Sequence, residues 1–138
     1  MTHDSISPPE GISVFKTRIA IFWFQEDGIL RILVKQDVEG TVSDLRELIE
    51  LIFEKSKGKL YPALIDIRSM KTFPRDVRKY FGRDDRPRAG IASAYLVQST
   101  LSRLFGNLFL SLGKSVIPTK VFTSEKSALE WLEGFRNG

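Results

Sequence analysis

The feature that most constrains the fold of this chain is an alternation of two kinds of segment. Short β-branched and aromatic runs are separated by longer segments in which apolar residues recur every three or four positions. The first kind is typical of strands and the second of amphipathic helices. Strands separated by single helices need crossover connections, which join parallel strands. The pattern therefore predicts an α/β fold with a mixed, mostly parallel sheet.

The first two runs predict an N-terminal β-hairpin. Residues Thr17–Phe24 and Ile29–Val34 are rich in β-branched and aromatic side chains, and four residues join them. The pair Asp27-Gly28 in this connection suits the left-handed dihedral angles of a tight turn. We expect the hairpin to form an antiparallel edge of the sheet.

Four helices alternate with three further strands in the predicted order ββαβαβαβα, which has about five strands. The first helix has the clearest limits, because Thr41 to Asp44 resembles a capping box and Gly58 follows its last turn. The remaining strands are expected at Ala63–Ile67, Ile91–Val97 and Thr119–Phe122, and the remaining helices from Phe73 or Pro74 to Phe81, from Leu101 to Leu112, and from Thr123 or Ser124 to Phe135.

The length of 138 residues fits one domain, which can bury about two-thirds of its unfolded surface. Residues 1–12 are polar and contain prolines, so we expect a disordered tail there and one α/β domain over residues 13–138. No segment approaches the roughly 20 apolar residues that span a bilayer, and the start does not resemble a secretory signal. These features predict a cytoplasmic protein.

The residue types present disfavour most catalytic chemistry. The chain has no cysteine, and its single histidine, His3, lies in the expected tail. Zinc sites and Ser-His or Cys-His nucleophile pairs need such residues in a folded cleft. No glycine-rich phosphate loop occurs. We therefore expect a binding protein rather than an enzyme, without a metal or cofactor.

The predicted order and the segment Ala63–Met70 together resemble the STAS domain of bacterial anti-sigma factor antagonists. Two further segments are similar to this family, Arg103–Phe109 and Val121–Leu132, and the resemblance covers about Thr17 to Phe135. It implies a STAS-like fold and a regulatory, protein-binding role in which a partner kinase phosphorylates a serine after the strand that ends at Ile67.

The family's phosphorylation motif, of the Asp-Ser-Ser/Thr-Gly type, aligns with Lys71 to Pro74. Its aspartate and glycine are absent. Thr72 still places a hydroxyl at the start of a predicted helix, where the helix dipole favours a phosphate, so Thr72 and Ser69 are the candidate phosphoacceptors. Both residue types also serve as helix caps or turn residues, which is the structural alternative.

Asp66 is the candidate binding residue at the end of a predicted strand. Ligands of open α/β sheets collect at the carboxyl ends of the strands, so we expect a pocket near Asp66 and Tyr95 for a nucleotide, a lipid or another anion. Alternatively, Asp66 ties down the adjoining loop. An enzyme that uses Asp66 with Lys71 or Lys120 would lack the usual set of nucleophile, base and orienting group.

Basic residues concentrate in one segment of the chain. The net charge is +4, and residues 68–88 hold eight basic side chains against three aspartates. Such a patch can bind an acidic protein or an anionic ligand, or it can be a solvated helix face; nucleic acid is disfavoured because no known motif accompanies it. The candidate partner-binding residues are Arg68, Lys71, Arg75, Arg78, Lys79, Arg83, Arg86 and Arg88.

The predicted helix from Leu101 to Leu112 is expected to pack in the core through a stripe that includes Leu101 and Phe105. Leu110 falls nearly opposite this stripe, on a face with Arg103, Gly106 and Asn107. Small and polar residues beside an outward leucine suit a partner helix. We therefore expect a homodimer contact, if one exists, on the face that contains Leu110.

Overall fold

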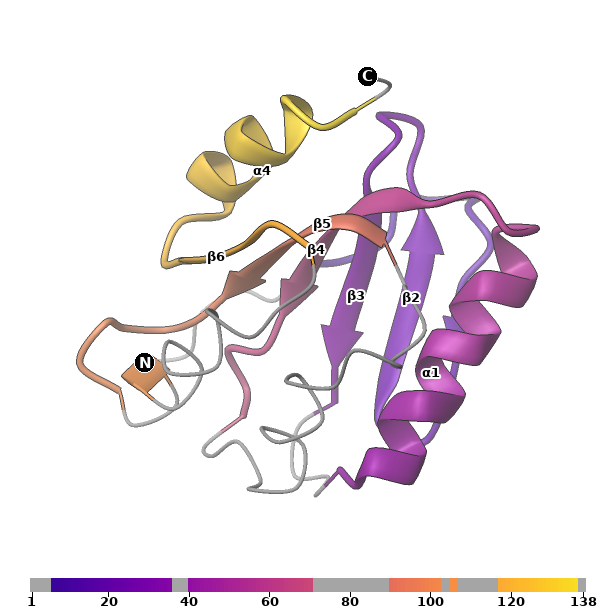
Figure 1. Cartoon of the computed structure of the whole chain (residues 1–138), viewed down its shortest axis with the longest axis horizontal. Coiled ribbons are helices and arrows are strands. Elements are labelled where there is room, and N and C mark those ends of the chain that lie inside the picture. The colour runs from indigo at the N-terminus through magenta and orange to yellow at the C-terminus, as the bar shows by residue number, and fades with distance from the viewer. Residues whose placement is uncertain (1–5, 36–39, 71–89, 103–104, 107–116, 137–138) are drawn as a thin grey trace.

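The structure is a computed structural model, which describes residues 6–35, 40–70, 90–102, 105–106 and 117–136. In these residues it has a sheet of six strands and two long helices (Figure 1). The elements are β1 (Phe15–Lys16), β2 (Ala20–Phe24), β3 (Leu30–Val34), α1 (Val42–Lys55), β4 (Tyr61–Asp66), β5 (Gly90–Leu96), β6 (Thr119–Phe122) and α4 (Glu125–Glu133).

The strands lie in the sheet in their order along the chain, from β1 to β6. The pairs β1–β2 and β2–β3 are antiparallel, and the three remaining pairs are parallel. The α/β class, the hairpin and the parallel pairs were predicted from the sequence. The count of about five strands was one too low, because β1 has only two residues and is too short to show a period.

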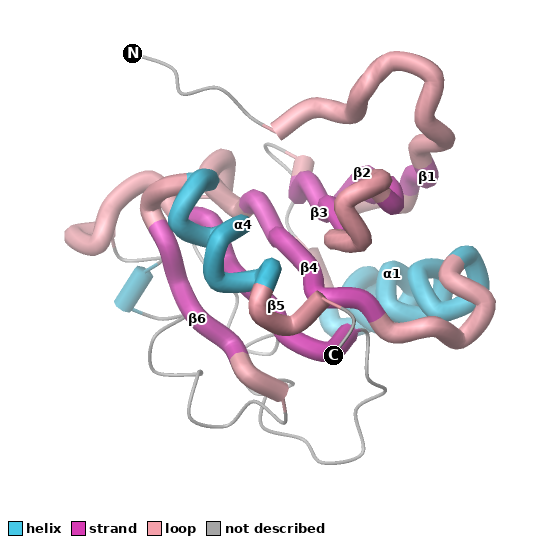
Figure 2. Tube along the Cα trace, turned by 90° about the horizontal axis from the view of Figure 1, so that it is seen from above, coloured by secondary structure: helices cyan, strands magenta, loops and turns pink. Residues whose placement is uncertain are grey.

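Alternation along the strands divides the core between the two faces of the sheet. Phe22, Leu30 and Ala63 face α1 and pack with its buried residues Leu48 and Ile52. On the other face, the sheet residues Trp23, Leu64, Ala94 and Leu96 pack with the α4 residues Ala128 and Leu132. The two helices therefore cover different sides of the sheet (Figure 1 and Figure 2).

Part of the segment before β1 packs onto the face that α4 covers. Ile6 is only 5% exposed and belongs to the same buried cluster as Trp23, and Ile12 and Val14 pack against this cluster. Figure 2 shows this segment as a loop beside β2 and β3. Residues from Ile6 onward, part of the segment predicted as a disordered tail, thus pack against the sheet. The nine residues from Ile6 to Val14 hold only three such apolar side chains, too few to define a helix or strand from the sequence.

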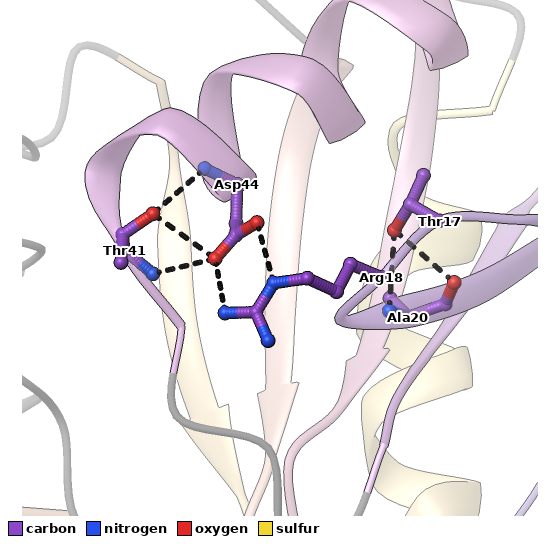
Figure 3. A network of polar contacts seen from close by, with 5 residues as sticks. All are labelled: Thr17, Arg18, Ala20, Thr41 and Asp44. Carbon is purple, nitrogen blue, oxygen red and sulfur yellow. Dashed lines mark hydrogen bonds and ion pairs between the residues drawn. The ribbon is translucent and has the colours of Figure 1, made fainter.

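The start of α1 confirms the predicted capping box. The hydroxyl of Thr41 accepts a hydrogen bond from the backbone N–H of Asp44, and the Asp44 carboxylate accepts one from the backbone N–H of Thr41. Arg18 adds two hydrogen bonds to this carboxylate, at 3.0 Å from Nε and 2.7 Å from Nη2 (Figure 3). The loop between β1 and β2 is thereby fixed to the helix that covers its face of the sheet.

Two predicted helices fall wholly or partly outside the described residues. Residues 73–81 lie outside the described residues, as do residues 103–104 and 107–116 of the helix predicted from Leu101. Phe105 and Gly106 are helical. Leu101 itself is 94% exposed and lies in a turn before the helix, which corrects its expected place in an inward stripe.

Candidate functional site at the carboxyl ends of the parallel strands

Asp66, the last residue of β4, forms a buried ion pair with Arg68. Its side chain is 1% exposed and that of Arg68 is 12% exposed. Oδ1 accepts hydrogen bonds from the backbone N–H and the Nε of Arg68, both at 3.0 Å, and Oδ2 accepts one from Nη2 at 2.8 Å. The Asp66 carboxylate is therefore bound by a bidentate guanidinium, the strongest arrangement of this pair.

A fourth hydrogen bond connects the same carboxylate to the start of the chain. The backbone N–H of Ile6 donates to Oδ2 of Asp66 at 3.1 Å. Burial alone would raise the pKa of Asp66, but the hydrogen bonds from Arg68 and Ile6 outweigh it and hold the pKa below its ordinary value. Asp66 is thus an ionised structural residue, in agreement with the loop-tying alternative and unsuited to act as a proton acceptor.

The structure does not bring Asp66 and Tyr95 together. In the β4–β5 register Asp66 is paired with Leu96, while Tyr95 is paired with Ile65. Leu96 belongs to the cluster beneath α4, and Tyr95 packs with Val97 and Ile67 in a separate cluster. Because neighbouring residues of a strand point to opposite faces, one pocket between Asp66 and Tyr95 has no geometric basis.

Most residues of the predicted basic patch lie outside the described part of the chain. These are Lys71, Arg75, Arg78, Lys79, Arg83, Arg86 and Arg88, together with the candidate phosphoacceptor Thr72 and the predicted dimer residue Leu110. Ser69 is described and is partly buried in the turn that follows β4. Arg68 is described as well, and its bonds to Asp66 engage its guanidinium within the chain.

The turn that follows β5 displays an apolar side chain at the same end of the sheet. Leu101 is held there by its neighbours: its backbone N–H donates to the hydroxyl of Ser99, and the hydroxyl of Ser102 donates to the backbone carbonyl of Ser99. The Ser102 hydroxyl also accepts from the backbone N–H of Phe105, as an N-cap does. In the sequence, Ser99 and Ser102 could have indicated that the helix starts after Leu101.

A second ion pair, partly buried, lies at the opposite end of the sheet and was not predicted from the sequence. Arg31 of β3 is buried, and its Nη1 donates to Oδ1 of Asp27 at 2.7 Å and to the carbonyl of Ile29 at 2.9 Å. Arg136, just after α4, donates to the carbonyl of Asp27. The hairpin turn is thus joined to the end of the C-terminal helix. In the sequence, the spacing of four residues between Asp27 and Arg31 could have indicated their ion pair.

Stability should depend on pH through Asp44, whose hydrogen bonds from Arg18 lower its pKa from 3.8 to about 2. The folded carboxylate binds its proton less readily than the unfolded one, so its contribution is present above pH ~4 and is lost as the pH falls towards about 2. Urea denaturation should show the difference in unfolding free energy between wild type and Asp44→Asn narrowing over this range.

The control for this measurement is Arg18→Met. In that background the effect of Asp44→Asn at pH 6 should be smaller, because the main cause of the lowered pKa is gone. An effect of Asp44→Asn that stays constant from pH 6 to pH 2.5 would contradict the assignment. Asp27 and Asp66 also have lowered pKa values, so wild type should lose stability in the same direction.

The described residues contain no group of three or more histidine, cysteine, aspartate or glutamate side chains arranged to hold a metal ion. No helix in the part of the chain that the structure describes is long and apolar enough to cross a membrane. At the carboxyl ends of β4 and β5 the structure has the buried ion pair of Asp66 with Arg68 and a turn, held by serine hydroxyls, that exposes Leu101. Such a surface can bind another molecule.

Comparison with known proteins gives a family without an assigned role. No curated protein matches the chain. Among solved structures, a crystal structure at 2.20 Å resolution of a protein with unknown function from Arthrobacter sp. FB24 is 29% identical, with a TM-score of 0.30, and the match covers 80% of this chain and 96% of that one. The family model of DUF7793, a domain of unknown function, matches residues 22–136 of this chain. The chain belongs to the DUF7793 family.

Proposed function

We propose that this chain is a non-catalytic, STAS-like regulatory module that binds a protein partner at the carboxyl ends of β4 and β5. The single observation that carries the proposal is Leu101, an almost fully exposed apolar side chain on a turn fixed by two serine hydroxyls. Interfaces depend on a few apolar anchors that are already ordered before binding, because less conformational entropy is then lost.

The charge of the neighbouring segment supports an acidic partner. Residues 68–88 follow β4 directly and carry an excess of five positive charges. We do not expect Arg68 to contact the partner. Moving its guanidinium away would leave the carboxylate of Asp66 buried without its cation. The partner-binding arginines are therefore expected among the later residues of the segment, such as Arg75, Arg78 and Arg83.

Photo-crosslinking in the native cell tests the proposal. A photoreactive amino acid at position 101 should form an adduct with one polypeptide partner. The control position is Phe53, which is 52% exposed on α1, away from the carboxyl ends of β4 and β5. An adduct at position 101 and none at position 53 is the expected result. Equal adducts at both positions, or none at position 101, would exclude this surface.

Charge reversal in the same experiment tests the chemistry of the partner. The triple variant Arg75→Glu, Arg78→Glu and Arg83→Glu should remove the adduct at position 101, because an acidic surface would then be repelled. The matched control reverses three exposed lysines elsewhere, Lys16, Lys57 and Lys126, and gives the same net charge. Loss of the adduct in both variants would show a nonspecific charge effect instead.

Phosphorylation at Thr72 or Ser69 is the proposed means of regulation, on the basis of the STAS resemblance. Mass spectrometry of the chain purified from its own cell should detect one phosphate on one of these residues under some growth conditions. A negative charge beside the basic segment would weaken binding to an acidic partner. Unmodified Thr72 and Ser69 under all tested conditions would leave the protein-binding proposal standing and remove its regulation.

A further inference from the structure

A second potential binding region lies at the other end of the parallel strands. A pocket of about 150 Å³ opens where the β2–β3 turn meets the first residues of β4 and β5. In Figure 1 the turn between β2 and β3 and the start of β4 lie at the same end of the sheet, opposite the tip of the β3 arrow. The apolar side chains that line the pocket include those of Phe24, Leu30, Tyr61, Pro62 and Ile91.

An irregularity in the β4–β5 pairing produces this hollow. Tyr61 is paired with Gly90 but Pro62 is paired with Ala92, so Ile91 is an extra residue opposite the two. Bulges of this kind redirect a side chain and interrupt the ladder. The walls are nevertheless fixed, because the rings of Phe24 and Tyr61 meet edge to face with centroids 5.0 Å apart.

Lys59 supplies a positive charge at this pocket. Its Nζ lies 5.1 Å from the centroid of the Tyr61 ring, and no carboxylate of the described residues forms an ion pair with it. Lys55 makes a comparable contact, with Nζ 5.3 Å from the centroid of Phe15, but it pairs with Glu54 at 3.5 Å and does not line the pocket. Among these two lysines, only Lys59 offers an uncompensated charge to a ligand in the pocket.

A second hydrogen-bond donor comes from Gln25, which also lines the pocket. Its Oε1 accepts a hydrogen bond from Nε1 of Trp23 at 3.0 Å, which fixes the orientation of the amide. The amide nitrogen then remains a donor without a partner in the described part of the chain. The lining holds the donors of Lys59 and Gln25 and no acidic side chain among the described residues, which favours a ligand that presents acceptor oxygens with negative charge.

The size of the pocket limits the rest of the ligand. A protein cavity of about 150 Å³ with apolar walls holds one benzene ring, whereas drug-sized ligands need about 300–1,000 Å³. We propose that this pocket binds a small carboxylic acid with an apolar body of about one ring, with the ring packed against the touching rings of Phe24 and Tyr61 and the carboxylate towards Lys59. This site is separate from the proposed protein-binding surface, and neither proposal depends on the other.

Titration of the full chain by NMR spectroscopy tests the site with three probes. Benzoate has both ring and charge, benzyl alcohol has the ring without the charge, and acetate has the charge without the ring. Benzoate should bind more tightly than either of the other two, with saturable shifts of backbone amides at Gly28, Leu60 and Ile91. Shifts centred elsewhere, or no saturation with benzoate, would overturn the proposal.

Two lysine variants separate the proposed contact from a general charge effect. Lys59→Gln should weaken benzoate binding about fivefold, as expected for an exposed ion pair, and should leave benzyl alcohol unchanged. Lys55→Gln should change neither. Equal weakening of benzoate by both variants, or weakening of benzyl alcohol by Lys59→Gln, would also overturn the proposal, since the carboxylate would then not be recognised by Lys59.

Discussion

Asp66→Ala is expected to lower the free energy of unfolding by about 3–5 kcal/mol, the cost of removing one partner from a buried ion pair. The change would leave the guanidinium of Arg68 without its carboxylate and the backbone N–H of Ile6 without an acceptor. Urea denaturation followed by circular dichroism at pH 7 measures the loss. The effect should be among the largest for any polar residue in the described part of the chain, because four hydrogen bonds depend on one carboxylate that is only 1% exposed.

Asp66→Asn separates charge from shape in this experiment. The amide keeps one acceptor oxygen and nearly the same volume, so it should destabilise the fold less than alanine does. Replacing both partners, as Asp66→Asn with Arg68→Met, should recover part of the loss, since no unpaired charge then remains. A loss below about 1 kcal/mol for Asp66→Ala would show that water replaces the carboxylate and that the ion pair is not a structural anchor.

Gly90→Ala is expected to destabilise the fold by about 1–3 kcal/mol or more, the range for overpacking in a well-packed interior. A Cβ atom at this position would lie 2.4 Å from the backbone carbonyl oxygen of Tyr61, far inside contact distance. The obstacle is backbone rather than a flexible side chain, so β4 and β5 would have to separate at their first pair. The same denaturation measurement detects this loss.

Gly106→Ala is the matched control. A Cβ added there meets no atom within 4 Å, and the residue is helical and exposed. Alanine is favoured over glycine in a helix by about 0.5–1 kcal/mol, so this variant should be neutral or slightly more stable than wild type. Equal stability of the Gly90→Ala and Gly106→Ala variants would mean that the close approach of Gly90 to Tyr61 does not constrain the sheet.

The ion pairs show where sequence patterns stop being informative. Asp27 and Arg31 are four residues apart, and a turn followed by a strand brings them together, so local spacing could have indicated this pair. Asp66 and Ile6 are 60 residues apart, and their hydrogen bond depends on the path of the N-terminal segment across the sheet. Nothing in the polar, proline-containing start of the chain indicates that path.

The hairpin, the capped first helix and the three later strands were predicted from the sequence because each depends on interactions between residues close in the chain. The β-branched and aromatic runs of β2 and β3 and the Thr41–Asp44 box are examples. Contacts between distant segments decided three other features: the β4–β5 register that places Asp66 and Tyr95 on opposite faces of the sheet, the burial of Ile6, and the pocket beside Lys59. Local propensity fixes the direction of a side chain relative to its own strand, whereas packing of all the elements decides what that side chain meets.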